Sequence, residues 1–169
     1  MEILRTERQL IRHITLEDAD FILALLNTPG WLAYIGDRGV RTVAAAEQYI
    51  QERILPSYQA HGFGFYACEL LQDTTVVGIC GFAQRPYLAE PDLGYGFLPA
   101  YMGQGLATEA ALALLNYGHS SLGFTILSAI ITPDNQRSIR LITQLGFIAA
   151  GNIRVPPEME EINLYRWGG

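Results

Sequence analysis

The chain has 169 residues, 50% of them hydrophobic and 17% charged, which suffices for one well-buried core and is too short for two ordinary domains. There are 17 acidic residues against 11 basic ones, all of them arginine, and the formal charge of -6 argues against a general nucleic-acid binder, which needs a basic face. No apolar run approaches the ~18 residues that cross a bilayer and no apolar leader is visible, so we expect a cytoplasmic protein without a membrane partner.

Hydrophobic periodicity and turn residues predict a series of strands and helices. Thr15 and Thr42 are typical helix N-caps, and Gly62 and Gly146 stand where glycine commonly ends a helix. Pro56 is expected to kink or shorten the helix that contains it. In chain order, the predicted elements are a strand at 10–14, a helix from Thr15 to a break at 27–30, a loop at 31–41, a helix from Thr42 towards Tyr58, strands at 63–71, 76–83 and 93–98, a helix at 105–117, a strand at 124–132, a helix at 134–145 and a final strand at 162–167.

This order predicts a single mixed α/β (α+β) domain over residues 1–169. Residues 72–75 read as the turn of an antiparallel hairpin, whereas the strands on either side of the 105–117 helix are expected to be parallel. Gly94 and Gly96, inside the 93–98 strand, are compatible with a bulge. Cys68 and Cys80 lie in apolar strand-like runs without CxxC spacing, and we expect them to be small buried hydrophobes.

The most informative segment joins the 93–98 strand to the following helix through a turn that contains Gly103 and Gly105. Such a turn leaves several N–H groups unpaired at a helix N-terminus, where the helix dipole adds about half a positive charge. A phosphate or pyrophosphate is a natural ligand there, and glycine lets it approach the backbone. A dinucleotide fingerprint would need a third glycine at Thr108, and a P-loop would need a lysine, which the chain lacks. A tight strand-to-helix connection without a ligand is the alternative interpretation.

Two motifs carry a resemblance to a known family. Met102-Gly103-Gln104-Gly105-Leu106-Ala107 resembles the pyrophosphate loop Gln/Arg-x-x-Gly-x-Gly/Ala of the GNAT superfamily of N-acetyltransferases, although Met102 departs from its polar first position. Asn135-Gln136-Arg137-Ser138 and Leu145-Gly146-Phe147 are similar to the Asn-x-x-Ser and Leu-Gly-Phe elements of the ribosomal-protein N-terminal acetyltransferase branch. Thr108-Glu109-Ala110 and residues 35–38 are also similar to that branch, so the likeness covers nearly the whole chain.

The resemblance implies an acetyl-CoA-dependent N-acetyltransferase in which an amine attacks the thioester directly. It also implies a mostly antiparallel sheet with one splayed parallel strand pair and helices on both faces. The acceptor would be a primary amine, on a protein N-terminus or a small molecule, and the enzyme a monomer or homodimer. A non-catalytic acyl-CoA-binding module is the alternative, because a tyrosine that many relatives carry one helical turn after the serine is Ile142 here. A nucleotide-binding module is a third possibility.

The same resemblance assigns the site. The acetyl carbonyl would lie against the Phe97–Leu98 backbone, and Ser138 would hydrogen-bond the leaving thiolate, unless it only caps or packs the helix. Asn135 would lie near the pantetheine arm, and Arg137 or Arg140 near the 3′-phosphate. The implied catalytic groups are Ser138 and the backbone of Phe97 and Leu98, and the implied acetyl-CoA contacts are Phe97, Leu98, Met102, Gly103, Gln104, Gly105, Leu106, Ala107, Thr108, Asn135, Ser138 and Arg140.

No single carboxylate is marked out as a general base. The acidic run Glu158, Glu160 and Glu161 is a candidate, with a solvated loop or a water-mediated base as alternatives. The aromatic residues Trp31, Tyr34 and Tyr87 are candidates for the acceptor cleft, or for simple packing. The three histidines are scattered, so we expect neither a metal site nor a Ser-His-Asp triad.

Overall fold

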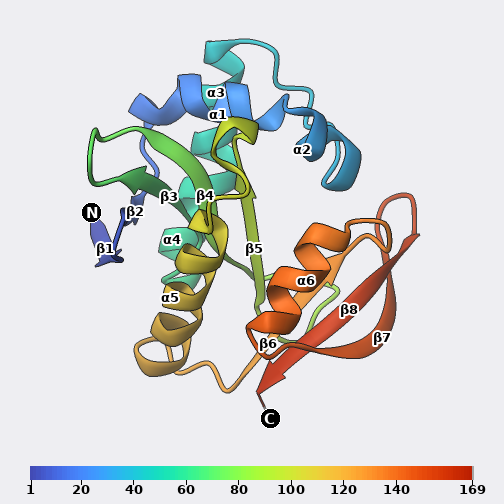
Figure 1. Cartoon of the computed structure of the whole chain (residues 1–169). Helices are drawn as coiled ribbons and strands as arrows, with labels where there is room; N and C mark the ends of the chain where they lie inside the picture. The colour runs from blue at the N-terminus through green and yellow to red at the C-terminus, as the bar shows by residue number, and fades with distance from the viewer. Residues whose placement is uncertain (169) are drawn as a thin grey trace.

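The computed structural model describes residues 1–168, which form one eight-stranded sheet with helices on both faces (Figure 1). The strand order is β1-β2-β3-β4-β5-β6-β8-β7, and neighbouring strands are antiparallel except for the parallel pair β5–β6. The predicted mixed α/β class is therefore confirmed. The strands are β1 (Glu2–Arg5), β2 (Gln9–His13), β3 (Phe65–Leu70), β4 (Val76–Ala83), β5 (Asp92–Phe97), β6 (Ile126–Ile131), β7 (Ile148–Val155) and β8 (Glu160–Gly168).

Two hydrophobic clusters cover opposite faces of the sheet, because successive strand residues point to opposite sides. In β3, Tyr66 and Cys68 belong to the cluster under α5 (Leu106–Ser120) and α6 (Gln136–Gln144), and Ala67 between them belongs to the cluster under the helices of residues 19–61. Both cysteines are buried and free, as expected. Within residues 1–168, no helix is both long enough and apolar enough to cross a bilayer. The helices are α1 (Ala19–Leu26), α2 (Pro29–Tyr34), α3 (Val43–Tyr49), α4 (Leu55–His61), α5 (Leu106–Ser120) and α6 (Gln136–Gln144).

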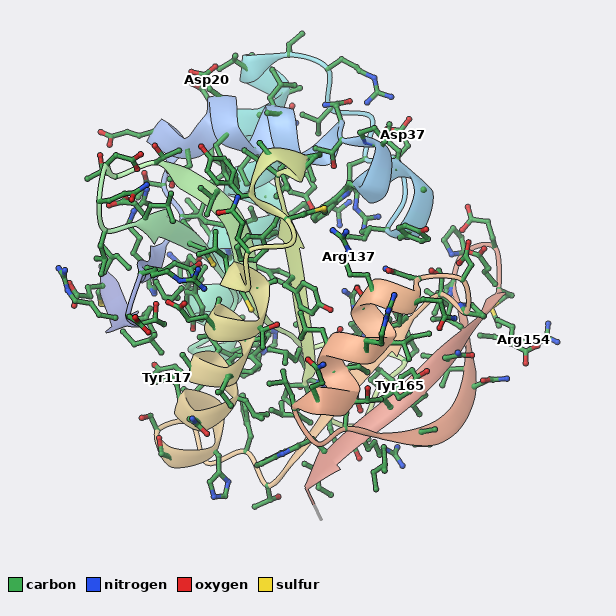
Figure 2. All side chains as sticks on the ribbon, in the orientation of Figure 1. Asp20, Asp37, Tyr117, Arg137, Arg154 and Tyr165 are labelled. Carbon is green, nitrogen blue, oxygen red and sulfur yellow. The ribbon has the colours of Figure 1, made fainter. Side chains whose placement is uncertain are left out.

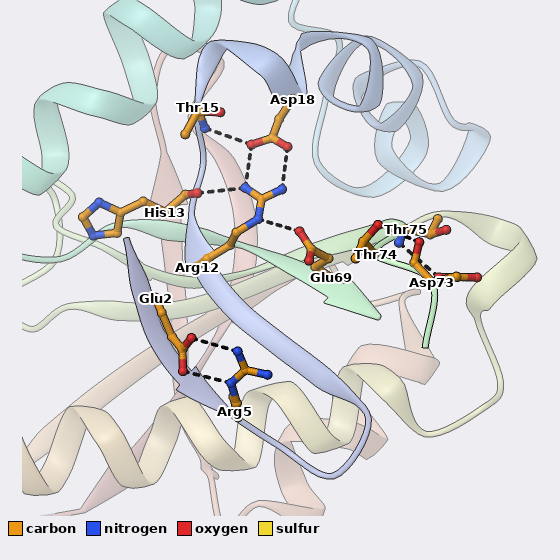
Figure 3. Close-up of polar contacts among 10 residues, drawn as sticks. All are labelled: Glu2, Arg5, Arg12, His13, Thr15, Asp18, Glu69, Asp73, Thr74 and Thr75. Atoms are coloured by element: carbon orange, nitrogen blue, oxygen red, sulfur yellow. Dashed lines mark hydrogen bonds and ion pairs between the residues drawn. The ribbon is translucent and has the colours of Figure 1, made fainter. Parts of the chain in front are cut away.

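A partly buried ion-pair network attaches the start of the helical layer to the sheet (Figure 3). The Arg12 guanidinium on β2 donates to both carboxylate oxygens of Asp18 at 2.9 Å and to Glu69 on β3 at 2.7 Å. Asp18 also accepts from the amide of Thr15 at 2.8 Å, and Thr15 is the helix N-cap that the sequence predicted. Since Asp18 is only 6% exposed, this bidentate pair sets where α1 leaves the sheet.

Strands β5 and β6 pair at one end and then diverge. Asp92 and Ser128 are the residues in register, and the Ser128 amide donates to the Pro91 carbonyl at 2.9 Å. No further β5–β6 pairing occurs among the described residues, so the carboxyl ends of the two strands are splayed. In Figure 1, α5 and α6 lie on either side of β5 at this opening.

The sequence prediction was wrong about the segment after the first helix. Residues 31–34, expected to be loop, belong to α2. The Thr28 side chain accepts from the Trp31 amide at 3.3 Å and Pro29 occupies the first turn, so the residues that were interpreted as a helix stop also start a new helix. The expected interruption near Pro56 appears as a short π-helical segment, Ile50–Ile54, directly before α4. Strands β1 and β7, which no prediction specified, complete the two edges of the sheet.

The glycines inside β5 do not form the bulge with which they were compatible. The register with β4 runs without interruption from Phe97 opposite Gly78 to Asp92 opposite Ala83. A Cβ at Gly96 would lie 2.7 Å from the Trp31 ring, and one at Gly94 would lie 3.1 Å from the Phe65 ring. The glycines therefore make room for aromatic rings that pack closely against the strand.

Gly81 in β4 offers a test of this close packing. A Cβ there would lie 2.2 Å from the Gly64 carbonyl oxygen and 2.7 Å from the Phe65 Cα, and backbone atoms cannot rotate away. Gly81→Ala should therefore lower the free energy of unfolding by about 2–3 kcal/mol in urea denaturation. Gly30→Ala is the control, because a Cβ at this position in α2 meets nothing within 4 Å. Equal stability of the two variants would contradict the packing described.

Candidate active site

The turn before α5 presents a group of free backbone amides. Gly103 and Gly105 have φ of 76° and 79°, in the left-handed region that favours glycine, and Gly105 is the N-cap of α5. The first amide to bond back into the helix is that of Glu109, which donates to the Gly105 carbonyl at 3.0 Å. In the described chain, no protein acceptor is found for the amides of residues 103–108. Residues 102–105 are exposed, so the turn is open to a ligand.

The β1–β2 connection holds this turn from the side. The Arg8 guanidinium donates to the Gln104 carbonyl at 2.8 Å and to the Glu109 carboxylate at 2.7 Å. Glu109 also accepts from the Arg8 amide at 2.9 Å and from the Thr6 hydroxyl at 2.6 Å. The Arg8 Nη2 lies 3.4 Å from where a Cβ on Gly105 would stand, so a positive charge borders the turn.

Sequence reasoning missed this support. The sequence did single out Thr108-Glu109-Ala110 as similar to the family. No sequence pattern, however, paired Glu109 with Thr6 and Arg8, which lie about a hundred positions earlier. Burial alone would raise the pKa of Glu109, but the hydrogen bonds from Thr6 and Arg8 outweigh it and hold that pKa below its ordinary value. The carboxylate is therefore charged at neutral pH, where it orders Arg8.

The amides of Phe97 and Leu98, both expected at the acetyl carbonyl, differ in whether they are already hydrogen-bonded within the sheet. The Leu98 amide donates to the Val77 carbonyl of β4 at 2.9 Å and is thus part of the sheet. Because alternate residues of an antiparallel strand turn their amides to opposite sides, the Phe97 amide faces β6. Pairing with β6 has ended there, so the Phe97 amide lies in the splayed region.

The start of α6 faces the same opening. The Asn135 side chain caps this helix, accepting from the Ser138 amide at 3.3 Å. Ser138 is half-buried, and its carbonyl oxygen lies 3.5 Å from the hydroxyl of Tyr95 on β5. Arg140 is exposed and donates to the Gln136 carbonyl at 3.3 Å, and Figure 2 shows Arg137 at the start of α6 on the side towards α2.

The aromatic and acidic residues predicted to line the acceptor cleft do not all lie close together in the structure. Trp31 is buried against Gly96 of β5, and its indole N–H has no partner in the described chain. Tyr34 is 39% exposed at the end of α2. Tyr87 instead lies beside Arg85, near the end where β5 and β6 pair. The acidic run at the turn between β7 and β8 is solvent-exposed, and Glu161 accepts from the Asn152 side chain at 2.8 Å.

No metal site was found: among residues 1–168, His, Cys, Asp and Glu side chains form no group of three or more able to hold an ion.

Removing the charge of Glu109 tests the support of the turn. Glu109→Gln should lower the free energy of unfolding by about 1–2 kcal/mol at neutral pH, since it weakens hydrogen bonds from one charged and two neutral donors. The folded-state pKa lies below the ordinary value of 4.5, so this contribution is present above pH 4.5 and disappears as the pH falls through the folded-state pKa. Urea denaturation from pH 7 down to about pH 3 should show wild type and variant converging.

Glu47→Gln on the exposed side of α3 is the matched control and should equal wild type throughout. Equal stability of the Glu109 and Glu47 variants at pH 7 would disprove the supporting role of Glu109.

Known proteins share this architecture. A family model described as an acetyltransferase (GNAT) domain matches residues 8–148. The uncharacterized N-acetyltransferase YoaA of Bacillus subtilis (strain 168) is 30% identical over 155 residues, covering 90% of this chain and 86% of that protein. The crystal structure of the acetyltransferase from Agrobacterium tumefaciens str. C58 has a TM-score of 0.81 at 22% identity, covering 100% of this chain and 95% of that one.

The ribosomal L7/L12 α-N-protein acetyltransferase RimL, solved in complex with coenzyme A, has a TM-score of 0.83 at 16% identity, covering 99% of this chain and 97% of that one. At such identities the two structural likenesses concern the fold, while the family model and the B. subtilis relative identify the family. The resemblance inferred from the two motifs is thereby confirmed, and the chain belongs to the GNAT family of acetyltransferases.

Proposed function

We propose that the protein transfers an acetyl group from acetyl-CoA to a primary amine, by direct attack of the amine on the thioester in a ternary complex. The observation that carries the proposal is the row of free amides at residues 103–108, at the open end of the splayed strands. Six N–H groups at a helix N-terminus form a site for a diphosphate, and coenzyme A carries one. The coenzyme A complex of RimL, which has the same fold, supports this choice of ligand.

The proposed path of the cofactor follows the exposed groups of the site. The diphosphate would bind the turn from Met102 to Thr108, with Arg8 adding positive charge beside it. The pantetheine arm would then pass between β5 and α6, where the Asn135 amide nitrogen can donate to it. Arg140, exposed on α6, is the proposed contact of the 3′-phosphate.

The chemistry proposed for the open end of β5 follows from the direction of its amides. A tetrahedral intermediate puts negative charge on the former carbonyl oxygen, and a fixed donor stabilises it. The Phe97 amide faces the splayed region and can serve this purpose, whereas the Leu98 amide is already bonded to Val77. Ser138 would lie near the leaving sulfur as a hydrogen-bond donor.

The acceptor must attack as a neutral amine. An α-amino group, with a pKa of about 7.7–8.0, is partly neutral near physiological pH, whereas a lysine amine near 10.4 needs a base. We therefore propose an α-amino group or an equally weakly basic small-molecule amine as acceptor, with deprotonation by water or by the acidic run Glu158, Glu160 and Glu161.

Release of free CoA thiol tests the proposal. Purified protein with acetyl-CoA should liberate thiol in the presence of one class in a panel of unblocked peptides, polyamines and amino-sugar compounds. N-acetylated peptides of the same sequences are the matched controls and should be inert. Tight CoA binding with no thiol release across the panel would favour the non-catalytic acyl-CoA-binding module, and protection from heat by ATP but not by CoA would favour a nucleotide-binding module.

A charge placed in the turn should prevent cofactor binding. Gly105→Glu puts a carboxylate among the free amides and should weaken CoA binding at least about tenfold in isothermal titration calorimetry. Gly123→Glu is the matched control, because Gly123 has a similar φ of 74° and a Cβ there would meet nothing within 4 Å. Gly123 follows the C-terminus of α5, at the opposite end of this helix from the turn. Unchanged affinity in the Gly105 variant would refute the diphosphate site.

A further inference from the structure

The departing thiolate is stabilised by a hydrogen-bond donor, and α6 contains no tyrosine whose phenol could be that donor. As the C–S bond breaks, the electron pair stays on sulfur, and a hydrogen bond to that charge lowers the barrier. Ile142, the residue that follows Ser138 by one turn, is 1% exposed and is packed in the core. Any phenol at the thioester must therefore come from another element.

Tyr95 reaches the opening from the opposite side. It lies on β5 between Leu93 and Phe97, on the face that packs under α5 and α6. Its ring extends from the strand to α6, where its hydroxyl lies 3.5 Å from the Ser138 carbonyl oxygen. The phenol therefore spans the space between the splayed strand and the helix that carries Ser138.

Tyr95 and Phe97 are close enough to act on one thioester. Two residues along a strand are about 6.6 Å apart, and both side chains and both amides share an orientation. A thioester sulfur is bonded directly to the carbonyl carbon whose oxygen we place at the Phe97 amide. The contact to Ser138 is at the outer limit of hydrogen bonding, so the hydroxyl is free to turn towards a stronger acceptor.

We propose that the Tyr95 phenol donates a hydrogen bond to the sulfur of coenzyme A as the thiolate departs, an inference that rests on the proposed acetyl transfer. The amine nitrogen forms the new C–N bond, the C–S bond breaks, and its electron pair remains on sulfur. The amine proton leaves to water or the base, and Tyr95 keeps its own proton throughout.

The protonation state of Tyr95 agrees with a donor that does not give up its proton. Burial raises the pKa of Tyr95 to about 12, although hydrogen bonding to Ser138 acts in the opposite direction. The phenol is therefore neutral throughout the range in which a thiol with a pKa near 8.5 ionises. A hydrogen bond from a neutral phenol to a thiolate is charge-assisted and is stronger than a neutral one.

Product binding tests this inference without knowledge of the acceptor. Calorimetry at about pH 9, where a thiol is mostly ionised, compares coenzyme A with desulfo-CoA, in which hydrogen replaces the thiol. Wild type should prefer coenzyme A by about tenfold, the fold-change expected of a hydrogen bond to a charged group. Tyr95→Phe should lose this preference while keeping the wild-type affinity for desulfo-CoA, which also shows that its site is folded.

Tyr117→Phe is the matched control and should keep the preference, because Tyr117 lies in the second half of α5, away from the turn (Figure 2). Ser138→Ala separates the two donors. A preference that survives in Tyr95→Phe and vanishes in Ser138→Ala overturns the inference in favour of the serine, and a wild type that binds both ligands equally overturns it outright. A wild type that binds neither ligand refutes the proposed function itself.

Discussion

The site depends on where two parallel strands stop pairing. β5 and β6 meet at Asp92 and Ser128 and then separate, which leaves the Phe97 amide facing a space that a ladder partner would otherwise fill. Asp92, 2% exposed, is bonded to Arg85 at 3.0 Å and so anchors the paired end. Burial raises the pKa of Asp92, and Arg85 acts against that rise. The ion pair thus offsets part of the desolvation cost of the buried carboxylate. A fixed junction at one end lets the other end stay open.

Two further features favour the anion site that we propose at the open end. Left-handed conformations at Gly103 and Gly105 turn the chain so that six amides find no acceptor within residues 1–168. The pair formed by Arg8 and Glu109 then holds this exposed turn against the first hairpin, so the donors are ordered before a ligand arrives. Preorganised dipoles of this kind are effective because they need little rearrangement when charge appears.

Local signals were enough to predict much of the fold, and contacts between distant residues explain the rest. The hairpin at 72–75, the buried strands and the glycine turn follow from periodicity and turn chemistry, and the structure has them. The prediction failed at α2 because Thr28 and Pro29 both end one helix and begin another, and a stop signal alone does not distinguish the two. Glu109 with Arg8, and Tyr95 with Ser138, lie far apart in the chain, and no spacing rule links them. The proposed roles of Phe97, Asn135, Ser138 and Arg140 rest on motif resemblance together with their positions around one opening.

A crystal structure with acetyl-CoA bound tests the central claim most directly. The diphosphate should lie on the amides of residues 103–108, and the acetyl carbonyl oxygen should lie about 2.7–3.2 Å from the Phe97 amide nitrogen, with the Leu98 amide still bonded to Val77. A cofactor bound elsewhere, or a thioester that lies outside the space between β5 and β6, would contradict it.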